Sequence, residues 1–119
     1  MIKLIALAAL LASLTLPNAA VAHAMLLKAT PGAGGSVSAP TELLLQFSEG
    51  VEPSFTTVAV TNAAGERVDR GAPKTASGDQ TTLHVGLTAL KPGDYKVEWH
   101  ATSVDTHKTS GHFGFSVTP

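Results

Sequence analysis

The chain has 119 residues, among them 8 Lys and Arg, 9 Asp and Glu, 5 His and no cysteine. Its formal net charge of −1 excludes a nucleic-acid-binding protein that acts through a basic patch. The lack of cysteine excludes disulfides, zinc fingers, iron–sulfur clusters and copper sites built on a thiolate.

The first 22 residues differ in composition from the rest. Lys3 is their only charge, and 17 of the 22 are Met, Ile, Leu, Ala or Val. This positive start, the apolar run 4–16 and the small residues Ala20-Val21-Ala22 are typical of a secretory signal peptide, and the run is too short for a membrane span of about 20 residues. We therefore expect a signal peptide over 1–22, cleavage after Ala22, and an exported domain over 23–119 that does not insert into a membrane.

Beyond this segment, apolar residues alternate with polar ones, which is the period of a half-buried β-strand. In chain order the alternation covers 43–48, 57–61, 83–87, 95–101 and 113–118. Turn-forming pairs such as Pro31-Gly32, Ser77-Gly78 and Pro92-Gly93 lie between these segments. We expect the polar stretch 65–80, which has weak strand signals at best, to be a loop. The pattern predicts an all-β Greek-key β-sandwich of about seven strands.

The alternation also predicts which side chains form the core. Trp99 lies in the clearest strand, 93–99, and we interpret it as a core residue rather than a ligand-stacking one. The predicted core is Leu43, Phe47, Val58, Leu83, Tyr95, Trp99, Phe113 and Phe115. His84 and His100 fall on the polar faces of their strands, where we expect them to be solvated.

Two features could bind a metal ion. After cleavage, His23 would offer both an α-amine and an imidazole to one ion, although the alternative is a frayed polar end. In Asp105-Thr106-His107, residues two apart on extended backbone point to the same side, about 6.5–7 Å apart, although the alternative is a turn aspartate and a surface histidine. Together these groups supply three nitrogens and one oxygen, a set that suits tetragonal Cu(II).

The chain from His23 onward resembles the CopC family of periplasmic copper-binding proteins, almost from end to end. The segments that carry the resemblance are 23–24, 29–34, 45–49, 90–99, 103–111 and 113–115. The resemblance implies a cupredoxin-like or Ig-like β-barrel sandwich in the periplasm. It also implies a Cu(II) site built from His23, Asp105 and His107, with Glu49 close by, where it could hold the α-amine by a hydrogen bond.

The sequence departs from the family in one respect. Some members carry a Met-rich loop that holds Cu(I), but the corresponding segment 61–80 has neither Met nor His, and Met25 is the only Met after residue 22. We therefore expect a Cu(II) protein without a Cu(I) site. His112, five residues after His107, is more consistent with a surface position than with a ligand.

The leading hypothesis is a monomeric periplasmic protein that is not an enzyme. It would bind Cu(II) for buffering, for resistance or for delivery to an inner-membrane importer, and the resemblance suggests a CopD-like partner. One alternative is an oxidative enzyme with a copper brace, because a terminal histidine supplies half of such a brace. An enzyme of this kind would need an open coordination position for oxygen, but Asp105 would fill that position. Another is an exported Ig-like scaffold domain without a metal.

Overall fold

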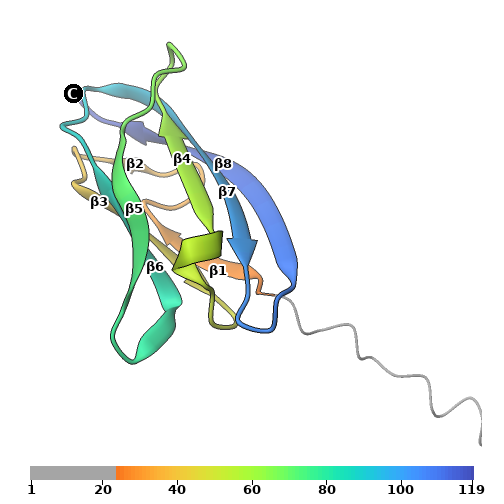
Figure 1. Cartoon of the computed structure of the whole chain (residues 1–119). Helices are drawn as coiled ribbons and strands as arrows, with labels where there is room; N and C mark the ends of the chain where they lie inside the picture. Colours follow the sequence, from red (N-terminus) through yellow and green to blue (C-terminus); the bar gives the residue numbers. More distant parts are fainter. Residues whose placement is uncertain (1–23) are drawn as a thin grey trace, which may run out of the picture.

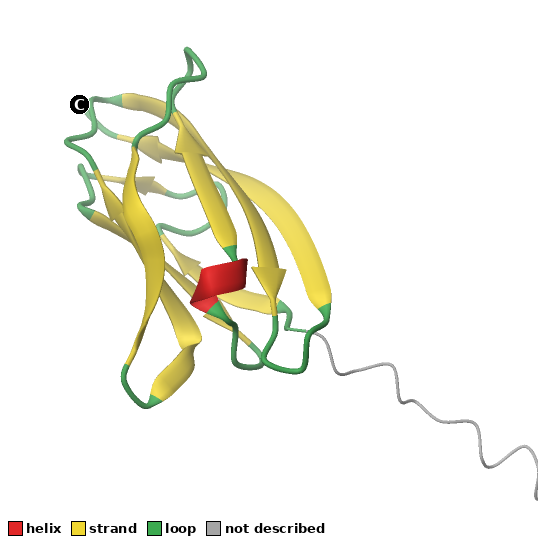
Figure 2. Ribbon diagram, in the orientation of Figure 1, coloured by secondary structure: helices red, strands yellow, loops and turns green. Residues whose placement is uncertain are grey.

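The computed structural model describes residues 24–119, so the predicted signal peptide and His23 lie outside the described residues. Within this range, strands make up nearly all of the regular structure, and a single turn of 3-10 helix follows the third strand (Figures 1 and 2). In chain order the elements are β1 (Leu26–Thr30), β2 (Ser36–Val37), β3 (Glu42–Phe47), η3 (Pro53–Phe55), β4 (Thr57–Thr61), β5 (Asp69–Ala76), β6 (Asp79–Leu87), β7 (Gly93–Thr102) and β8 (Lys108–Val117).

The strands form two four-stranded sheets, in the orders β1-β3-β6-β5 and β2-β8-β7-β4 (Figure 1). All neighbours are antiparallel except the short β2, which runs parallel to β8. β3 pairs with β6 although β4 and β5 intervene in sequence, and β4 pairs with β7 in the other sheet. These crossovers between sheets confirm the predicted all-β Greek-key sandwich.

Residues 24–119 form eight strands rather than about seven. β5 occupies much of segment 65–80, which the sequence pattern assigned to a loop, so that assignment is wrong. β5 lies at the edge of its sheet and most of its residues are exposed, because only β6 pairs with it. An edge strand of this kind needs no apolar face and tolerates Gly71 and Pro73, so it carries little alternation to detect.

The core lies between the sheets and contains seven of the eight residues predicted for it; Phe113 is only partly buried. Trp99 is 6% exposed, and its ring meets that of Phe47 edge to face, with centroids 5.3 Å apart. Tyr95 stacks on Phe115 and donates its hydroxyl to the Lys91 carbonyl at 2.6 Å. The interpretation of Trp99 as a core residue is confirmed.

Among the described strands, the β7–β8 hairpin has the longest register, from Gly93↔Val117 to Thr102↔Lys108. Its loop, residues 103–107, therefore emerges at one end of the sandwich, where segment 50–52 borders it. The Val104 amide donates to the Gly50 carbonyl at 3.0 Å, and the Glu52 amide donates to the Thr102 carbonyl at 2.8 Å. No helix long and apolar enough to cross a membrane is found in the part of the chain that the structure describes.

Candidate metal centre

The β7–β8 loop is a tight turn that brings Asp105 and His107 together. The Ser103 amide donates to the His107 carbonyl at 2.9 Å, and the Thr106 amide donates to the Ser103 carbonyl at 2.8 Å. Thr106 has a φ of 75°, a left-handed conformation that is uncommon for a β-branched residue. The His107 Nδ1 and Asp105 Oδ2 atoms are 3.2 Å apart, with both side chains partly exposed. A left-handed turn, not the extended backbone that we expected, produces this proximity.

Ser103 lies beneath this pair and is 1% exposed. Its hydroxyl donates a short hydrogen bond to Asp105 Oδ1, and the His107 amide donates to the hydroxyl oxygen at 3.2 Å. The bond from Ser103 is the largest influence on the Asp105 carboxyl; it outweighs desolvation and, with His107, holds the pKa of Asp105 below its usual range. The carboxylate is therefore ionised at neutral pH, as a metal ligand must be.

The start of the described chain is anchored beside the same loop. Ala24 is 1% exposed, and its carbonyl accepts a 2.8 Å hydrogen bond from the hydroxyl of Thr109, two residues beyond His107. The next residue, Met25, pairs with Ser48: its amide donates to the Ser48 hydroxyl at 2.9 Å, and its carbonyl accepts from the Ser48 amide at 2.8 Å. The chain thus enters the domain next to Asp105 and His107.

Glu49 adjoins this entry point, and one of its carboxylate oxygens, Oε2, is buried without a hydrogen-bond partner among the described residues. A buried carboxylate oxygen without a partner is costly, because it has lost its water and gained no donor. A donor or a cation at this position would remove the cost. The residues present therefore fit a site in which an ammonium group or a metal ion lies near Glu49.

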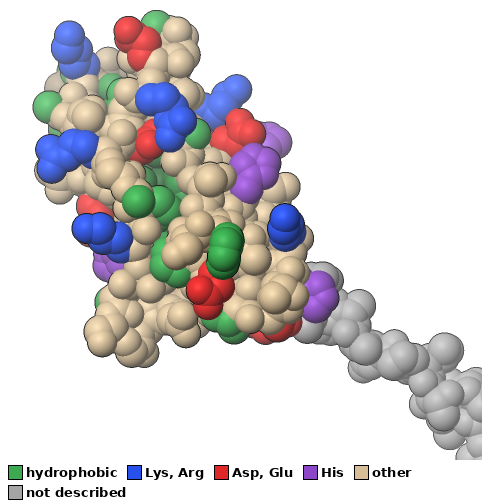
Figure 3. All heavy atoms as spheres, viewed as in Figure 1, with side chains coloured by type: hydrophobic (Ala, Val, Ile, Leu, Met, Phe, Trp, Pro, Cys, Tyr) green, Lys and Arg blue, Asp and Glu red, His purple; other side chains and the backbone are tan. Residues whose placement is uncertain are grey.

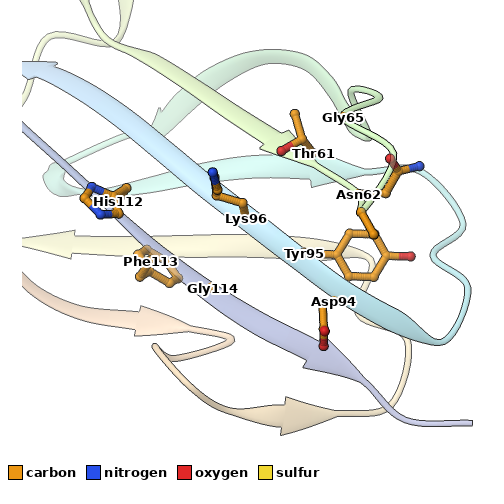
Figure 4. A pocket seen from close by; sticks show the side chains of 10 residues that line it. Thr61, Asn62, Gly65, Asp94, Tyr95, Lys96, His112, Phe113 and Gly114 are labelled. Carbon is orange, nitrogen blue, oxygen red and sulfur yellow. The ribbon is translucent and has the colours of Figure 1, made fainter.

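The other described histidines lie away from this loop. His84 is near Glu42 and His100 is near Glu98, with nitrogen–oxygen distances of 3.4 and 3.2 Å. His112 is exposed on β8 opposite Glu98. In Figure 4 it borders a hollow together with Tyr95 and Lys96, and neither Asp105 nor His107 lines that hollow.

In residues 24–119, no group of three or more His, Cys, Asp or Glu side chains is placed to hold a metal ion. Asp105 and His107 are two of the three ligands expected from the sequence, and the third, His23, lies outside the described range.

On the face shown in Figure 3, acidic, basic and histidine side chains are interspersed rather than gathered by sign. Charge on this face therefore gives no sign of a nucleic-acid partner.

Comparison with known proteins identifies the family. The model of the CopC domain matches residues 26–118. The chain belongs to the CopC family. Among its relatives, Protein YobA of Escherichia coli K12 is 45% identical over 114 residues, which are 94% of this chain and 91% of YobA. Copper transport protein CutJ of Bacillus subtilis is 36% identical over 104 residues, which are 86% of this chain but only 19% of CutJ.

Solved CopC structures have the same fold. CopC from Methylosinus trichosporium OB3b superposes with a TM-score of 0.77 at 30% identity, covering 82% of this chain and 95% of that one. PcoC from Escherichia coli, described as a methionine-rich copper resistance protein, gives a TM-score of 0.69 at 31% identity, covering 82% and 100%. These matches confirm the family resemblance and the β-sandwich predicted from the sequence.

Two residues of this candidate centre, Ser103 and Thr109, were not recognised from the sequence. Ser103 was one serine among several, and only its burial and its bonds to Asp105 and His107 set it apart. Thr109 holds Ala24 across a separation of 85 residues, for which no local pattern exists. A Ser two residues before an Asp-x-His triplet is the one signal that could have indicated Ser103.

Proposed function

We propose that this CopC-family protein binds one Cu(II) ion as cargo in the periplasm. The ligands would be the α-amine and imidazole of His23, the Asp105 carboxylate and the His107 imidazole. The observation that carries the proposal is the anchoring of buried Ala24 to Thr109 beside the Asp105–His107 pair. Consecutive Cα atoms are about 3.8 Å apart, so the amine and imidazole of the residue before Ala24 would be close enough to bind an ion together with that pair.

Glu49 supports the same assignment. Glu49 follows the end of β3 by two residues, and its side-chain Oε2 is buried. Its neighbour Ser48 is hydrogen-bonded to Met25 at the start of the described chain. An α-ammonium or a copper-bound amine at the entry of the chain would give this oxygen the donor that it lacks among the described residues. We therefore assign Glu49 to holding the terminal amine rather than to the metal itself.

A carrier role fits the ligand set better than catalysis. An oxidative copper-brace enzyme needs an open coordination position for oxygen, whereas here a carboxylate held in place by Ser103 stands beside the histidine. The soft ligands that stabilise Cu(I) are also scarce, because Met25 is the only Met in residues 24–119. We infer that the bound ion is Cu(II) and that the protein is not an enzyme.

The length of CutJ favours delivery as the purpose of binding. In that copper transport protein, a domain similar to this chain takes up 19% of a much longer polypeptide. We propose that this chain serves as a copper-donating module for a CopD-like membrane importer. Cells that lack the protein should then accumulate less cytoplasmic copper; greater copper sensitivity without a change in uptake would assign it to resistance instead.

The decisive experiment is a Cu(II) titration followed by EPR, on protein that begins at His23 and on protein with one extra alanine before it. The proposal expects one tightly bound ion with a tetragonal, nitrogen-rich spectrum, and weaker binding by the extended chain. His107→Ala should abolish the tetragonal, nitrogen-rich EPR spectrum of the bound ion. His112→Ala, the matched control on the exposed face of β8, should leave that spectrum unchanged.

Each contrary result has a definite meaning. Equal binding by the two chains would remove the α-amine from the site. No stoichiometric binding by either, with a melting temperature unchanged by Cu(II), would leave a metal-free scaffold domain, because a ligand specific for the native state must raise stability. Oxygen reduction by the copper-loaded protein with ascorbate, well above that of free copper, would favour the enzyme.

A further inference from the structure

We infer that Ser103 is a positioning residue that holds Asp105 and His107 in a metal-ready arrangement before copper arrives. The inference rests on the proposed Cu(II) site and concerns how this chain builds it. Thr56 and Ser103 are the two buried polar residues in the part of the chain that the structure describes. Of the two, Ser103 is the one whose hydroxyl contacts a proposed ligand.

Two acceptors lie within reach of the single proton of the Ser103 hydroxyl: Asp105 Oδ1 and, at 3.2 Å, the His107 carbonyl oxygen. The Asp105 carboxylate receives the proton, because it is charged and closer. The hydroxyl oxygen then accepts from the His107 amide at 3.2 Å, while the His107 carbonyl is bonded to the Ser103 amide at 2.9 Å. One buried side chain thus fixes the carboxylate of one ligand and the backbone of the other.

The base beneath this turn is itself fixed. Ser103 forms an isolated β-bridge with Val51, which is fully buried, and the neighbouring Val104 amide is bonded to Gly50. A side chain at position 50 would meet Val104 at 3.2 Å and Gln80 at 3.3 Å, so the two segments are closely packed. The Ser103 hydroxyl therefore acts from a rigid position rather than from a mobile loop.

This arrangement also restricts how Asp105 binds an ion. Ser103 donates to Oδ1, whereas Oδ2 faces His107 Nδ1 at 3.2 Å, so an ion held by both side chains would bind Oδ2 in place of that contact. A carboxylate that offers one oxygen suits the four-coordinate geometry of Cu(II). It suits Ca²⁺ less well, because Ca²⁺ takes six to eight oxygens and often binds a carboxylate through both. Ser103 thus contributes to the choice of ion as well as to its affinity.

The test compares Ser103→Ala with Thr56→Val in protein that begins at His23. The Thr56 hydroxyl is also buried at this end; it donates to the Glu52 carbonyl and accepts from the Thr102 amide, but contacts neither ligand. Ser103→Ala should weaken Cu(II) binding about 10- to 100-fold and change the EPR parameters, because the freed carboxylate rotates. Thr56→Val should lower the melting temperature without changing the affinity or the spectrum. Ser103→Thr, which keeps the hydroxyl, should restore the wild-type spectrum.

A measurement on the metal-free wild type does not depend on any variant folding. The His107 amide should exchange slowly with solvent, because Ser103 accepts its hydrogen bond before copper is added. Exchange at the rate of an open loop would overturn the inference, and so would wild-type affinity and spectrum in Ser103→Ala. If the wild type binds no Cu(II), the proposed function fails instead, and slow exchange of the His107 amide would still show that the turn is preformed.

Discussion

Gly111 on β8 is opposite Trp99 on β7, and the contact between them sets a firm limit on the side chain that position 111 can carry. A Cβ atom at position 111 would lie 2.7 Å from Trp99 Cζ2, 2.9 Å from Cε2 and 3.0 Å from Nε1. Carbon atoms prefer separations of about 3.5–4.0 Å, so the methyl group and the indole must move apart by roughly 1 Å. The indole has little room to do so, since it is buried and meets Phe47 on another side.

We therefore expect Gly111→Ala to lower the free energy of unfolding by about 2 kcal/mol. Overpacking of a well-packed core costs about 1–3 kcal/mol, and the loss of glycine's freedom in the unfolded chain returns about 0.4–1 kcal/mol. Urea denaturation followed by circular dichroism would measure the change. Gly32→Ala is the control: there the nearest atom would be the Ala29 carbonyl oxygen at 3.4 Å, an ordinary contact, so its stability should stay within about 0.5 kcal/mol of wild type.

The close approach of position 111 to the indole also predicts that substitutions at positions 99 and 111 are energetically coupled. Trp99→Phe shortens the ring that the new methyl group meets, so Gly111→Ala should cost less in that background, and a double-mutant cycle would measure the difference. Gly111→Ala as stable as wild type would refute the argument from close packing. An equal cost in both backgrounds would show that strain elsewhere in β8, rather than the indole, opposes the methyl group.

Three further predictions concern the site and the opposite edge. Glu49→Gln should weaken Cu(II) binding about tenfold in a calorimetric titration, with an unchanged circular dichroism spectrum, because it neutralises the buried carboxylate. Thr106→Gly should raise the free energy of unfolding by about 0.5–1 kcal/mol in urea, because glycine accepts the φ of 75° without strain. Asp69→Asn should lower the free energy of unfolding by about 1 kcal/mol at pH 7, and by progressively less as the pH falls below the usual Asp pKa of about 3.9. Burial opposes ionisation of Asp69, but hydrogen bonds from Arg67 and the Val60 amide outweigh it and hold the pKa below its usual range, so this stabilisation is lost as pH falls through that pKa.

The strands that could be predicted are those with one face on the core. β3, β4, β7 and β8 alternate because every second side chain enters the space between the sheets, as the burial of Leu43, Val58 and Trp99 shows. β5 could not be predicted in the same way. It has one neighbour and is mostly solvated, so hydrogen bonding to β6 holds it in place without an apolar pattern of its own.

The candidate site was predictable only as a set of chemical groups. The spacing of Asp105 and His107 indicated that they could act together, but the turn that unites them depends on a left-handed Thr106 and a buried Ser103. The turn and the chain entry beside it depend on tertiary contacts. The bridge from Ser103 to Val51 and the hydrogen bond from Thr109 to Ala24 join segments that are distant in sequence. Local patterns carry no information on such contacts.

The two parts of the proposed site differ in when they form. Asp105 and His107 are held by Ser103 within one hairpin, so this half exists as soon as the domain folds. The α-amine of His23 would become available only when the predicted signal peptide is cleaved, because until then it is part of a peptide bond. Full affinity for Cu(II) would therefore appear only after cleavage, and the unprocessed chain should bind copper more weakly. Copper binding by the precursor that equals that of the chain beginning at His23 would contradict this order of assembly.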